Sequence, residues 1–422
     1  MSNLHNIIIP SSIILTFPVL VVFLSSFFAN YNHEFKYTQI NHLLGYFIGS
    51  PMAYITIILL MIWSYIWIYL YKTKYDGKES YDGIIEYTPQ YSRGGILYFS
   101  TSILLIMIMN STWTNFSKIY LQNFPFFLQT LNILSFILCI YYYRLGKELR
   151  LMIKLEMNEK SKIFEFYNGL LRHYKFFSVD AKQLINSRFG ILIWEISIIT
   201  FGFYYFHNLH DNKINSGLMV NIILQTIYIG KFYGWEEGYF NTLDITMDKL
   251  GFYIIWGCMV YVPFLYTLST YYLVLYPPQL SWAESSCIMS FGIFSILMNY
   301  WVDYQKQIFF EKDGDVNIWG SKAKYIETIY TLNGEEKHGK LLISGFWGTS
   351  RHANYVFELM LSIAWCLPAV KISFVPFLYP IFMFILLGHR TFRDEKKCKE
   401  KYGIYWDNYC EIVKWRFIPY IF

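Results

Sequence analysis

Long apolar runs constrain this chain more than any other feature of its sequence. Ten runs are long enough to cross a bilayer as a helix, which takes about 17 to 25 residues. They fall at residues 6–28, 46–71, 94–113, 123–143, 189–208, 217–235, 252–276, 280–302, 354–370 and 373–389. Only 15% of the residues are charged, whereas a soluble domain is about a quarter charged. The sequence therefore predicts an all-α polytopic membrane protein with about ten transmembrane helices.

The runs follow one another without a linker, repeat or low-complexity tract. We therefore expect residues 1–422 to form a single integral membrane domain. Within it, residues 1–188 would supply N-terminal spans and an amphipathic loop, and residues 189–422 a catalytic and cofactor-binding part. The run at 6–28 lacks a basic leader and a small-residue cleavage site, which predicts a retained span rather than a signal peptide.

The basic residues indicate how the chain is oriented. Most of them lie in the segments 72–93, 144–188 and 303–353 and in the tail after His389. Because loops rich in lysine and arginine stay on the cytosolic side, we expect both termini to be cytosolic. The host membrane would be the endoplasmic reticulum in a eukaryote or the inner membrane in a bacterium. The segment 144–188 mixes basic and aromatic residues and is expected to lie along the membrane surface.

Polar residues gather between Leu341 and Glu358, where the ninth apolar run begins. Arg351, His352 and Asn354 lie there beside several aromatic residues. One interpretation is an anchor in which Arg351 reaches lipid phosphate and the aromatics form an interfacial belt. The other is a binding site for a charged ligand, since polar groups at a membrane helix must be paired. For the set as a whole, the site is the favoured interpretation.

Two other patterns accompany this stretch. Turn signals at residues 313–315 and 333–334 flank a segment that favours a β-hairpin over neighbouring helix ends. The six cysteines have no Cys-x-x-Cys pair and no nearby histidine pair, so neither a zinc site nor a disulfide framework is indicated.

Carboxylates inside apolar runs are costly and are functional hypotheses by default. The carboxylates that lie in or at the ends of the predicted spans are Glu195, Glu236, Glu237, Asp244, Asp248, Glu284 and Glu358. Spacings of seven and four residues would bring Glu237, Asp244 and Asp248 together on a continuing helix. For Glu236 and Glu237, the nearby Lys231 is a natural partner.

The tail after the last run is rich in arginine, lysine and aromatic residues. Guanidinium groups match phosphate geometry and aromatic rings can stack on a nucleotide, although binding of acidic lipid headgroups explains the tail equally well. Because the tail and the Leu341–Glu358 stretch are expected on one membrane face, they can form a single pocket. No Gly-x-Gly-x-x-Gly motif is present, so a dinucleotide would be bound in another way.

The same residues carry a resemblance to a known family. Residues 318–320, 340–355 and 389–422 resemble the sterol reductase family, which includes 7-dehydrocholesterol reductases, sterol C14 reductases and the membrane domain of the lamin B receptor. The sequence of residues 344–348 is most similar to that of the 7-dehydrocholesterol reductases. The likeness is strong after Trp235 and weak before it, and roughly the first third shares only its hydropathy.

The resemblance implies NADPH-dependent reduction of a sterol carbon-carbon double bond, with the cofactor in a cytosolic pocket and the sterol entering from the bilayer. The residues implied to bind the cofactor are Lys306, Leu342, Trp347, Asn354, Tyr355, Asp394, Cys398, Lys401, Tyr402 and Tyr409. Tyr228 matches the family's proposed proton donor, and Asp394 matches an aspartate implicated in both binding and catalysis. Glu236 and Asp244 match an acidic motif at the end of the sixth span. Membrane lipids are the other expected partner, and neither a metal nor a nucleic acid is implied.

The chain departs from the family pattern at three positions. Phe310 replaces an arginine one turn after Lys306, which bears on recognition of the cofactor's 2′-phosphate. Trp235 replaces an asparagine and Cys258 an aspartate, and both changes could reshape the sterol pocket.

The chemistry of an isolated alkene leads to the same roles. With no carbonyl to polarise the bond, protonation must precede hydride addition, so we expect Tyr228, coupled to Asp394 or Glu236, to act as a general acid. Reduction at Δ7 is the leading prediction, and Δ14 and Δ24 reduction stay open. Two further alternatives are an isoprenylcysteine-type membrane methyltransferase and a non-enzymatic sterol-binding protein.

Overall fold

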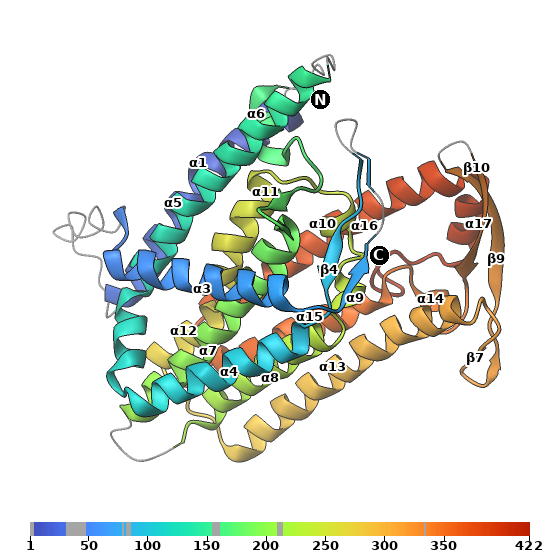
Figure 1. Cartoon of the computed structure of the whole chain (residues 1–422). Helices are drawn as coiled ribbons and strands as arrows, with labels where there is room; N and C mark the ends of the chain where they lie inside the picture. Colours follow the sequence, from blue (N-terminus) through green and yellow to red (C-terminus); the bar gives the residue numbers. More distant parts are fainter. Residues whose placement is uncertain are drawn as a thin grey trace. The chain divides into compact units, whose positions relative to one another are not determined.

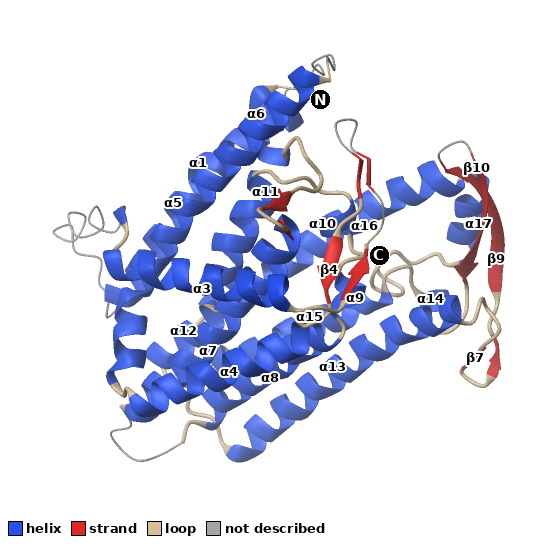
Figure 2. Cartoon of the chain, in the orientation of Figure 1, coloured by secondary structure: helices blue, strands red, loops and turns tan. Residues whose placement is uncertain are grey.

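Helices make up most of the chain, as Figure 2 shows. A computed structural model describes residues 4–30, 48–77, 80–81, 86–153, 161–208, 214–332 and 335–422. These residues group into two compact units. The N-unit comprises residues 1–214 and 225–277, and the C-unit comprises residues 215–224 and 278–422. The boundary falls inside helix α8, whose first half belongs to the C-unit.

Eight helical stretches of the described chain are long and apolar enough to cross a membrane, which confirms the all-α polytopic prediction. They are Asn6–Phe27, Pro51–Leu70, Gly95–Thr112, Asn115–Met152, Gln183–His207, Phe252–Leu275, Trp282–Glu311 and Val375–Tyr402. The other two predicted spans are helical as well: α8 covers Ser216–Gly234, and a shorter apolar stretch covers Ala353–Ala369. Every predicted span therefore corresponds to a helix.

The N-unit is built mainly of long helices. Its elements are η1 (Leu4–Ile8), α1 (Ile9–Asn30), α3 (Pro51–Leu70), α4 (Gly95–Thr112), α5 (Asn115–Met152), α6 (Lys162–Asn168), η4 (Gln183–Gly190), α7 (Ile191–His207), the second half of α8, α9 (Glu236–Tyr239), α10 (Leu243–Thr246), α11 (Phe252–Trp256), η5 (Gly257–Tyr266) and α12 (Leu268–Leu275). The 38-residue helix α5 packs against α1, α3, α7 and α11. Figure 1 shows α1 running alongside α5.

Short antiparallel strand pairs join these helices. They are β1 (Lys74–Asp76) with β4 (Gln90–Ser92), β2 (Ser80–Tyr81) with β3 (Glu86–Tyr87), and β5 (Lys175–Phe176) with β6 (Val179–Asp180). The predicted surface segment 144–188 is divided among the end of α5, α6, the β5–β6 pair and η4 in the described residues.

The C-unit combines helices with the longest strands of the chain. Its elements are the first half of α8, α13 (Trp282–Glu311), β7 (Asn317–Ile318), β8 (Ser321–Lys322), β9 (Tyr325–Leu332), β10 (Glu335–Leu342), α14 (Phe346–Thr349), α15 (Ala353–Cys366), η6 (Leu367–Ala369), η7 (Val375–Phe377), α16 (Leu378–Tyr402) and α17 (Ile404–Ile412). Helices α13 and α15 pack along one another. The start of α13 is capped by Ser281 and Glu284 in a reciprocal capping box, which satisfies two of its unpaired N–H groups.

The predicted β-hairpin is confirmed. Strands β9 and β10 pair antiparallel from Glu335 opposite Leu332 to Leu342 opposite Tyr325, and the predicted turn at 333–334 lies outside the described residues. The hairpin packs on α16 and α17 through an apolar cluster that includes Ile326, Leu341 and Trp406.

The end of the last helix differs from the prediction. We expected the span to end at residue 389 and a tail to follow, but α16 continues without a break to Tyr402. The apolar run ends where charges begin, whereas the backbone needs only helix-forming residues, which lysine, glutamate and arginine are. The charged tail therefore begins as an extension of the last helix.

Candidate functional site

All ten residues implied to bind a cofactor lie in the C-unit. Lys306 is on α13, Leu342 on β10, Trp347 on α14, Asn354 and Tyr355 on α15, Asp394, Cys398, Lys401 and Tyr402 on α16, and Tyr409 on α17. The C-unit thus brings together both predicted regions, the Leu341–Glu358 stretch and the tail.

Trp347 is buried at the centre of this group. Its indole Nε1 donates to the carbonyl oxygen of Val302 at 2.9 Å, and its own carbonyl accepts from the Tyr409 hydroxyl at 3.3 Å. Trp347 and Leu342 belong to one cluster of buried apolar side chains. The ammonium of Lys306 lies 4.0 Å from the centroid of the indole ring, a cation–π contact that holds a positive charge over an aromatic face.

A glycine brings Trp347 this close to α13. Gly345 has φ of 64°, and a Cβ atom on it would lie 2.4 Å from Oε1 of Gln305. That same Oε1 accepts the backbone N–H of Phe346 at 3.2 Å. A side chain at position 345 would be strained and would collide with Gln305, so glycine is required here.

Arg351 joins the start of α15 to the end of the chain. Its Nη2 lies 3.1 Å from Oε1 of Glu395, and Arg416 Nε donates to both oxygens of that carboxylate at 3.0 Å. The backbone N–H of Arg351 donates to the carbonyl of Trp415 at 3.0 Å, and its Nη1 contacts the Cys410 sulfur at 2.6 Å. Arg351 therefore ties the Leu341–Glu358 stretch to the tail.

His352, Asp394 and Cys398 form the polar centre of the site. His352 Nε2 and Cys398 Sγ each lie 3.9 Å from Oδ2 of Asp394. The imidazole stacks on the ring of Tyr355, with centroids 4.9 Å apart. Burial lowers the pKa of His352 to about 4, with Lys306 also lowering it and Asp394 opposing the shift. The imidazole is therefore neutral at pH 7.

Two side chains of α17, the buried Tyr409 and the half-buried Cys410, stay protonated because they are shielded from water. Burial raises the pKa of the Tyr409 phenol and of the Cys410 thiol, although Arg351 nearby opposes both shifts. Neither group is set up as a nucleophile by its surroundings.

Several buried polar atoms at this site lack a hydrogen-bond partner among the described residues. They are His352 Nε2, Asn354 Oδ1 and Arg351 Nε. Asn354 is held by its other atoms, because its Nδ2 donates to Asp303 at 3.0 Å and its backbone carbonyl accepts from Asn299 at 3.0 Å. Since buried polar groups are nearly always bonded, these atoms indicate a site that a polar ligand completes.

Two lysines add positive charge without a carboxylate to neutralise it. The ammonium of Lys401 lies 4.1 Å from the ring centroid of Tyr330 and 4.7 Å from that of Tyr402. Within the described residues, neither Lys306 nor Lys401 has a carboxylate oxygen within 4.0 Å. Cations over aromatic rings, together with the unbonded polar atoms, fit a phosphate-bearing ligand with flat rings such as a dinucleotide.

The other two predicted catalytic residues lie in the N-unit. Tyr228 is a half-buried residue of α8, and its ring centroid is 6.0 Å from that of Trp194 on α7. Trp194 is held by an indole N–H that donates to Gln225 at 2.8 Å, one turn before Tyr228. This packing orients the Tyr228 ring against α7.

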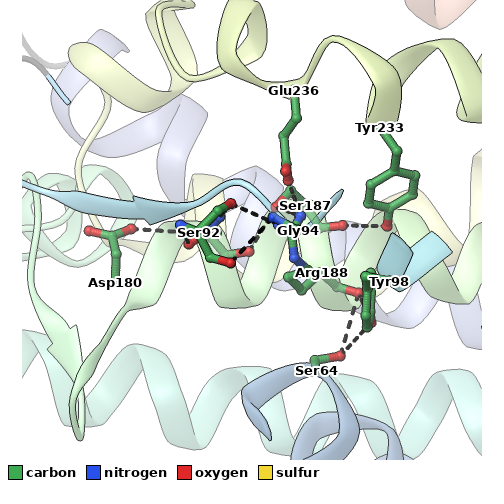
Figure 3. A network of polar contacts seen from close by, with 10 residues as sticks. Ser64, Ser92, Gly94, Tyr98, Asp180, Ser187, Arg188, Tyr233 and Glu236 are labelled. Atoms are coloured by element: carbon green, nitrogen blue, oxygen red, sulfur yellow. Dashed lines mark hydrogen bonds and ion pairs between the residues drawn. The ribbon is translucent and has the colours of Figure 1, made fainter. Parts of the chain in front are cut away.

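Glu236 lies at the start of α9 in a buried ion pair with Arg188 of η4, shown in Figure 3. Arg188 also donates from Nη2 to the Ser92 carbonyl at 3.1 Å, and its guanidinium lies over the rings of Tyr98 and Tyr233. The ion pair leaves neither charge exposed, since the Arg188 and Glu236 side chains are 1% and 6% exposed.

Two hydroxyls fix the backbone that carries this guanidinium. Tyr98 donates to the carbonyl of Arg188 and Tyr233 to that of Ser187, both at 2.6 Å (Figure 3). The network therefore binds Arg188 through both its guanidinium group and its backbone carbonyl. The sequence did not indicate Arg188 as the partner of Glu236, because the two are 48 positions apart.

The prediction of a continuing helix from Glu237 to Asp248 is wrong. α8 ends at Gly234 and is followed by the separate four-residue helices α9 and α10. Glycine at positions 234 and 238 weakens helix propagation. In place of a shared acidic face, Glu237 pairs with Arg93 at 3.0 Å, while the Asp244 and Asp248 carbonyls accept from the buried Lys182.

Comparison with known proteins identifies the class to which this fold and site belong. A model of the ergosterol biosynthesis ERG4/ERG24 family matches residues 4–422, so the chain belongs to that family of sterol reductases. The sequence-based resemblance is thereby confirmed.

Individual relatives refine this result. The chain is 39% identical to the 7-dehydrocholesterol reductase of Arabidopsis thaliana over 262 residues, which is 62% of this chain and 60% of the relative. It is 38% identical to the 7-dehydrocholesterol reductase of Xenopus laevis over 244 residues, 58% of this chain and 51% of the relative. It is 29% identical to the Delta(14)-sterol reductase of Schizosaccharomyces pombe over 328 residues, 78% of this chain and 73% of the relative.

Proposed function

We propose that this protein reduces a carbon-carbon double bond of a membrane sterol, with NADPH as the reductant and the ring Δ7 bond as the substrate bond. Family membership supports the reaction class. The observation that carries the cofactor assignment is the C-unit site, with two lysines over aromatic faces and buried polar atoms without partners.

The residues that would hold the cofactor divide by chemistry. Lys306 and Lys401 would pair with phosphate oxygens, and Asn354 and His352 would offer hydrogen bonds. Trp347, Tyr355, Tyr402 and Tyr409 would border the flat rings, and Leu342, Asp394 and Cys398 would complete the contact surface. A bound reduced nicotinamide nucleotide would supply the hydride.

The remaining step is protonation of the alkene, which requires an acidic side chain of the protein. We assign the proton to the Tyr228 hydroxyl, because an unactivated alkene accepts hydride only after protonation. The apolar packing around the α7–α8 contact would keep water from the resulting cation. In this assignment Asp394 contributes through the cofactor site, and Glu236 acts through its ion pair with Arg188, which fixes the end of α8.

Reduction of the Δ14 bond is the second candidate function. It is supported by the likeness to the Delta(14)-sterol reductase of Schizosaccharomyces pombe, which extends over 328 residues, 78% of this chain. We propose a multi-pass location in the endoplasmic reticulum of a eukaryotic host or the inner membrane of a bacterial host, with both termini cytosolic.

Product analysis tests this function. The chain would be expressed in cells that accumulate Δ7, Δ14 and Δ24 sterols, beside the Tyr228→Phe variant. We expect loss of the Δ7 sterol and gain of its saturated product with the wild type only. Loss of the Δ14 sterol instead would select the second candidate. Unchanged sterols with folded protein present would reject both, and a methylated prenylcysteine product would point to methyl transfer.

A further inference from the structure

Gln225 is a buried amide on the same face of α8 as Tyr228. Both residues belong to the N-unit, and the three positions between them place their side chains about one turn apart on the helix. Gln225 is 0% exposed, so its amide group needs hydrogen-bond partners inside the protein. Its surroundings therefore bear on the residue to which we assign the proton.

The partners of Gln225 come from two other helices. Its Oε1 accepts the indole N–H of Trp194, on α7, at 2.8 Å, and its Nε2 donates to the hydroxyl of Thr270, on α12, at 2.9 Å. Because an indole nitrogen only donates, the amide oxygen must face Trp194 and the amide nitrogen must face Thr270. The two bonds fix the rotation of the amide and join α7, α8 and α12 at one buried point.

Trp194 connects Gln225 to Tyr228. The indole is 1% exposed, and its ring centroid lies 6.0 Å from that of Tyr228. On η5, the ring of Tyr266 lies 5.0 Å from the indole and meets it at 90°. The indole cannot turn without breaking its hydrogen bond to Gln225 or its contact with Tyr266. The Tyr228 ring therefore packs against a surface whose position depends on Gln225.

We propose that Gln225 is a positioning residue that holds Trp194, and through it Tyr228, in the orientation needed for proton transfer, an inference that rests on the proposed function. In this role the amide itself transfers no proton. A displacement of about 1 Å at a reacting group can lower a rate about 100-fold. Loss of the amide should therefore lower turnover although the acid itself is still present.

A double-mutant cycle separates this role from a purely structural one. Gln225→Met keeps the approximate size of the side chain and removes both hydrogen bonds. We expect it to lower kcat about 10- to 100-fold, with KM within about twofold of the wild type. In the Tyr228→Phe background the same substitution should change the residual rate by less than about twofold, because no hydroxyl is left to position. Equal fold losses in both backgrounds would overturn the proposal.

Asn221→Leu is the matched control. Asn221 lies one turn before Gln225 on α8, is 0% exposed, and donates from its amide to the carbonyl of Trp365 at 2.7 Å. Its kcat should stay within about threefold of the wild type. A loss as large as that of Gln225→Met would overturn the proposal, because any buried amide of α8 would then have the same effect.

Thr270→Val covers the case in which Gln225→Met does not fold. It removes only the bond at Gln225 Nε2 and should give a smaller loss of kcat, which again disappears in the Tyr228→Phe background. A loss that persists in that background would overturn the proposal.

Ultraviolet resonance Raman spectroscopy of the tryptophans supplies a readout that needs no turnover. The indole N–H band responds to hydrogen bonding, so the difference spectrum between the wild type and Gln225→Met should show the loss of one bonded indole N–H. Asn221→Leu should show no such loss. Identical indole N–H bands in the wild type and Gln225→Met would overturn the proposal.

The proposed function and the positioning role fail in different ways. A folded wild type that reduces no sterol would overturn the proposed function, and the positioning role with it. An active wild type whose kcat is unchanged in Gln225→Met would overturn the positioning role alone.

Discussion

The two polar centres of this protein, one in each unit, differ in whether they are complete. In the N-unit, the charges of Arg188 and Glu236 satisfy each other, and tyrosine hydroxyls fix the surrounding backbone. In the C-unit, Lys306 and Lys401 lie over aromatic rings without a carboxylate, and His352 Nε2 has no hydrogen-bond partner among the described residues. A self-satisfied centre stabilises the fold, whereas we propose that the cofactor completes the other centre.

The largest expected effect tests the self-satisfied centre. Replacing Arg188 with Met should destabilise the protein by about 3–5 kcal/mol, because it leaves the Glu236 carboxylate buried without a counter-charge. The midpoint of thermal unfolding in detergent measures the change. The matched control is Arg93→Met, since its pair with Glu237 is about half exposed and should contribute less than about 1 kcal/mol.

A second variant sharpens this test. Adding Glu236→Leu to Arg188→Met removes the stranded charge, so part of the lost stability should return. Equal unfolding midpoints for the single and double variants would show that the ion pair is not what holds this centre together.

The next effect concerns pH and the C-unit. Because burial lowers the pKa of His352 from 6.5 to about 4, the unfolded chain binds a proton in that interval that the folded chain does not. Stability from this residue is complete above pH 6.5 and falls, by at most about 3 kcal/mol, as the pH drops toward 4. His352→Gln should flatten this part of the stability profile, while the exposed His207→Gln should leave it unchanged. Equal slopes in both variants would contradict the assignment.

A smaller effect is expected for the lysines of the incomplete centre. Lys306→Ala should weaken NADPH binding about 10- to 100-fold, as expected for a lost hydrogen bond between charged groups, with little change in unfolding. Titration of NADPH into purified protein measures this loss. Lys322→Ala, on the exposed strand β8, is the control that should bind normally. If Lys306→Ala changed stability but not affinity, the C-unit centre would be as self-contained as the other.

The smallest effect concerns cofactor choice. Phe310 is 53% exposed on α13, one turn after Lys306. Phe310→Arg should raise the preference for NADPH over NADH about tenfold by adding a cation for the 2′-phosphate. Phe310→Leu should leave the preference as it is. An unchanged ratio in the arginine variant would mean that this position does not read the phosphate.

The sequence predicted the helices well because membrane spans are encoded locally. Each apolar run corresponds to a helix, and the β9–β10 hairpin follows from a two-residue turn signal. The prediction failed where no apolar pattern exists: the extension of α16 to Tyr402, and the break after Gly234 into α9 and α10. The length of an apolar run reflects the thickness of the membrane. It does not fix the residues at which a helix begins and ends.

The sequence indicated candidate site residues but not the contacts that these residues make. The sequence of residues 340–355 predicted a site. It did not indicate that Arg351 pairs with Glu395 or that His352 lies close to Asp394. The pairing of Arg188 with Glu236 was likewise hidden by distance along the chain. The signal available was Arg188 itself, directly before the apolar run at 189–208, because a charge at a membrane span needs a partner.

One measurement tests the central claim most directly. Purified protein would be given NADPH with deuterium at the transferable position of the nicotinamide ring, together with a mixture of Δ7, Δ14 and Δ24 sterols. We predict one deuterium in the product saturated at Δ7, and none when Lys306→Ala is assayed at low NADPH. A folded protein that binds these sterols but yields no labelled product would contradict the account.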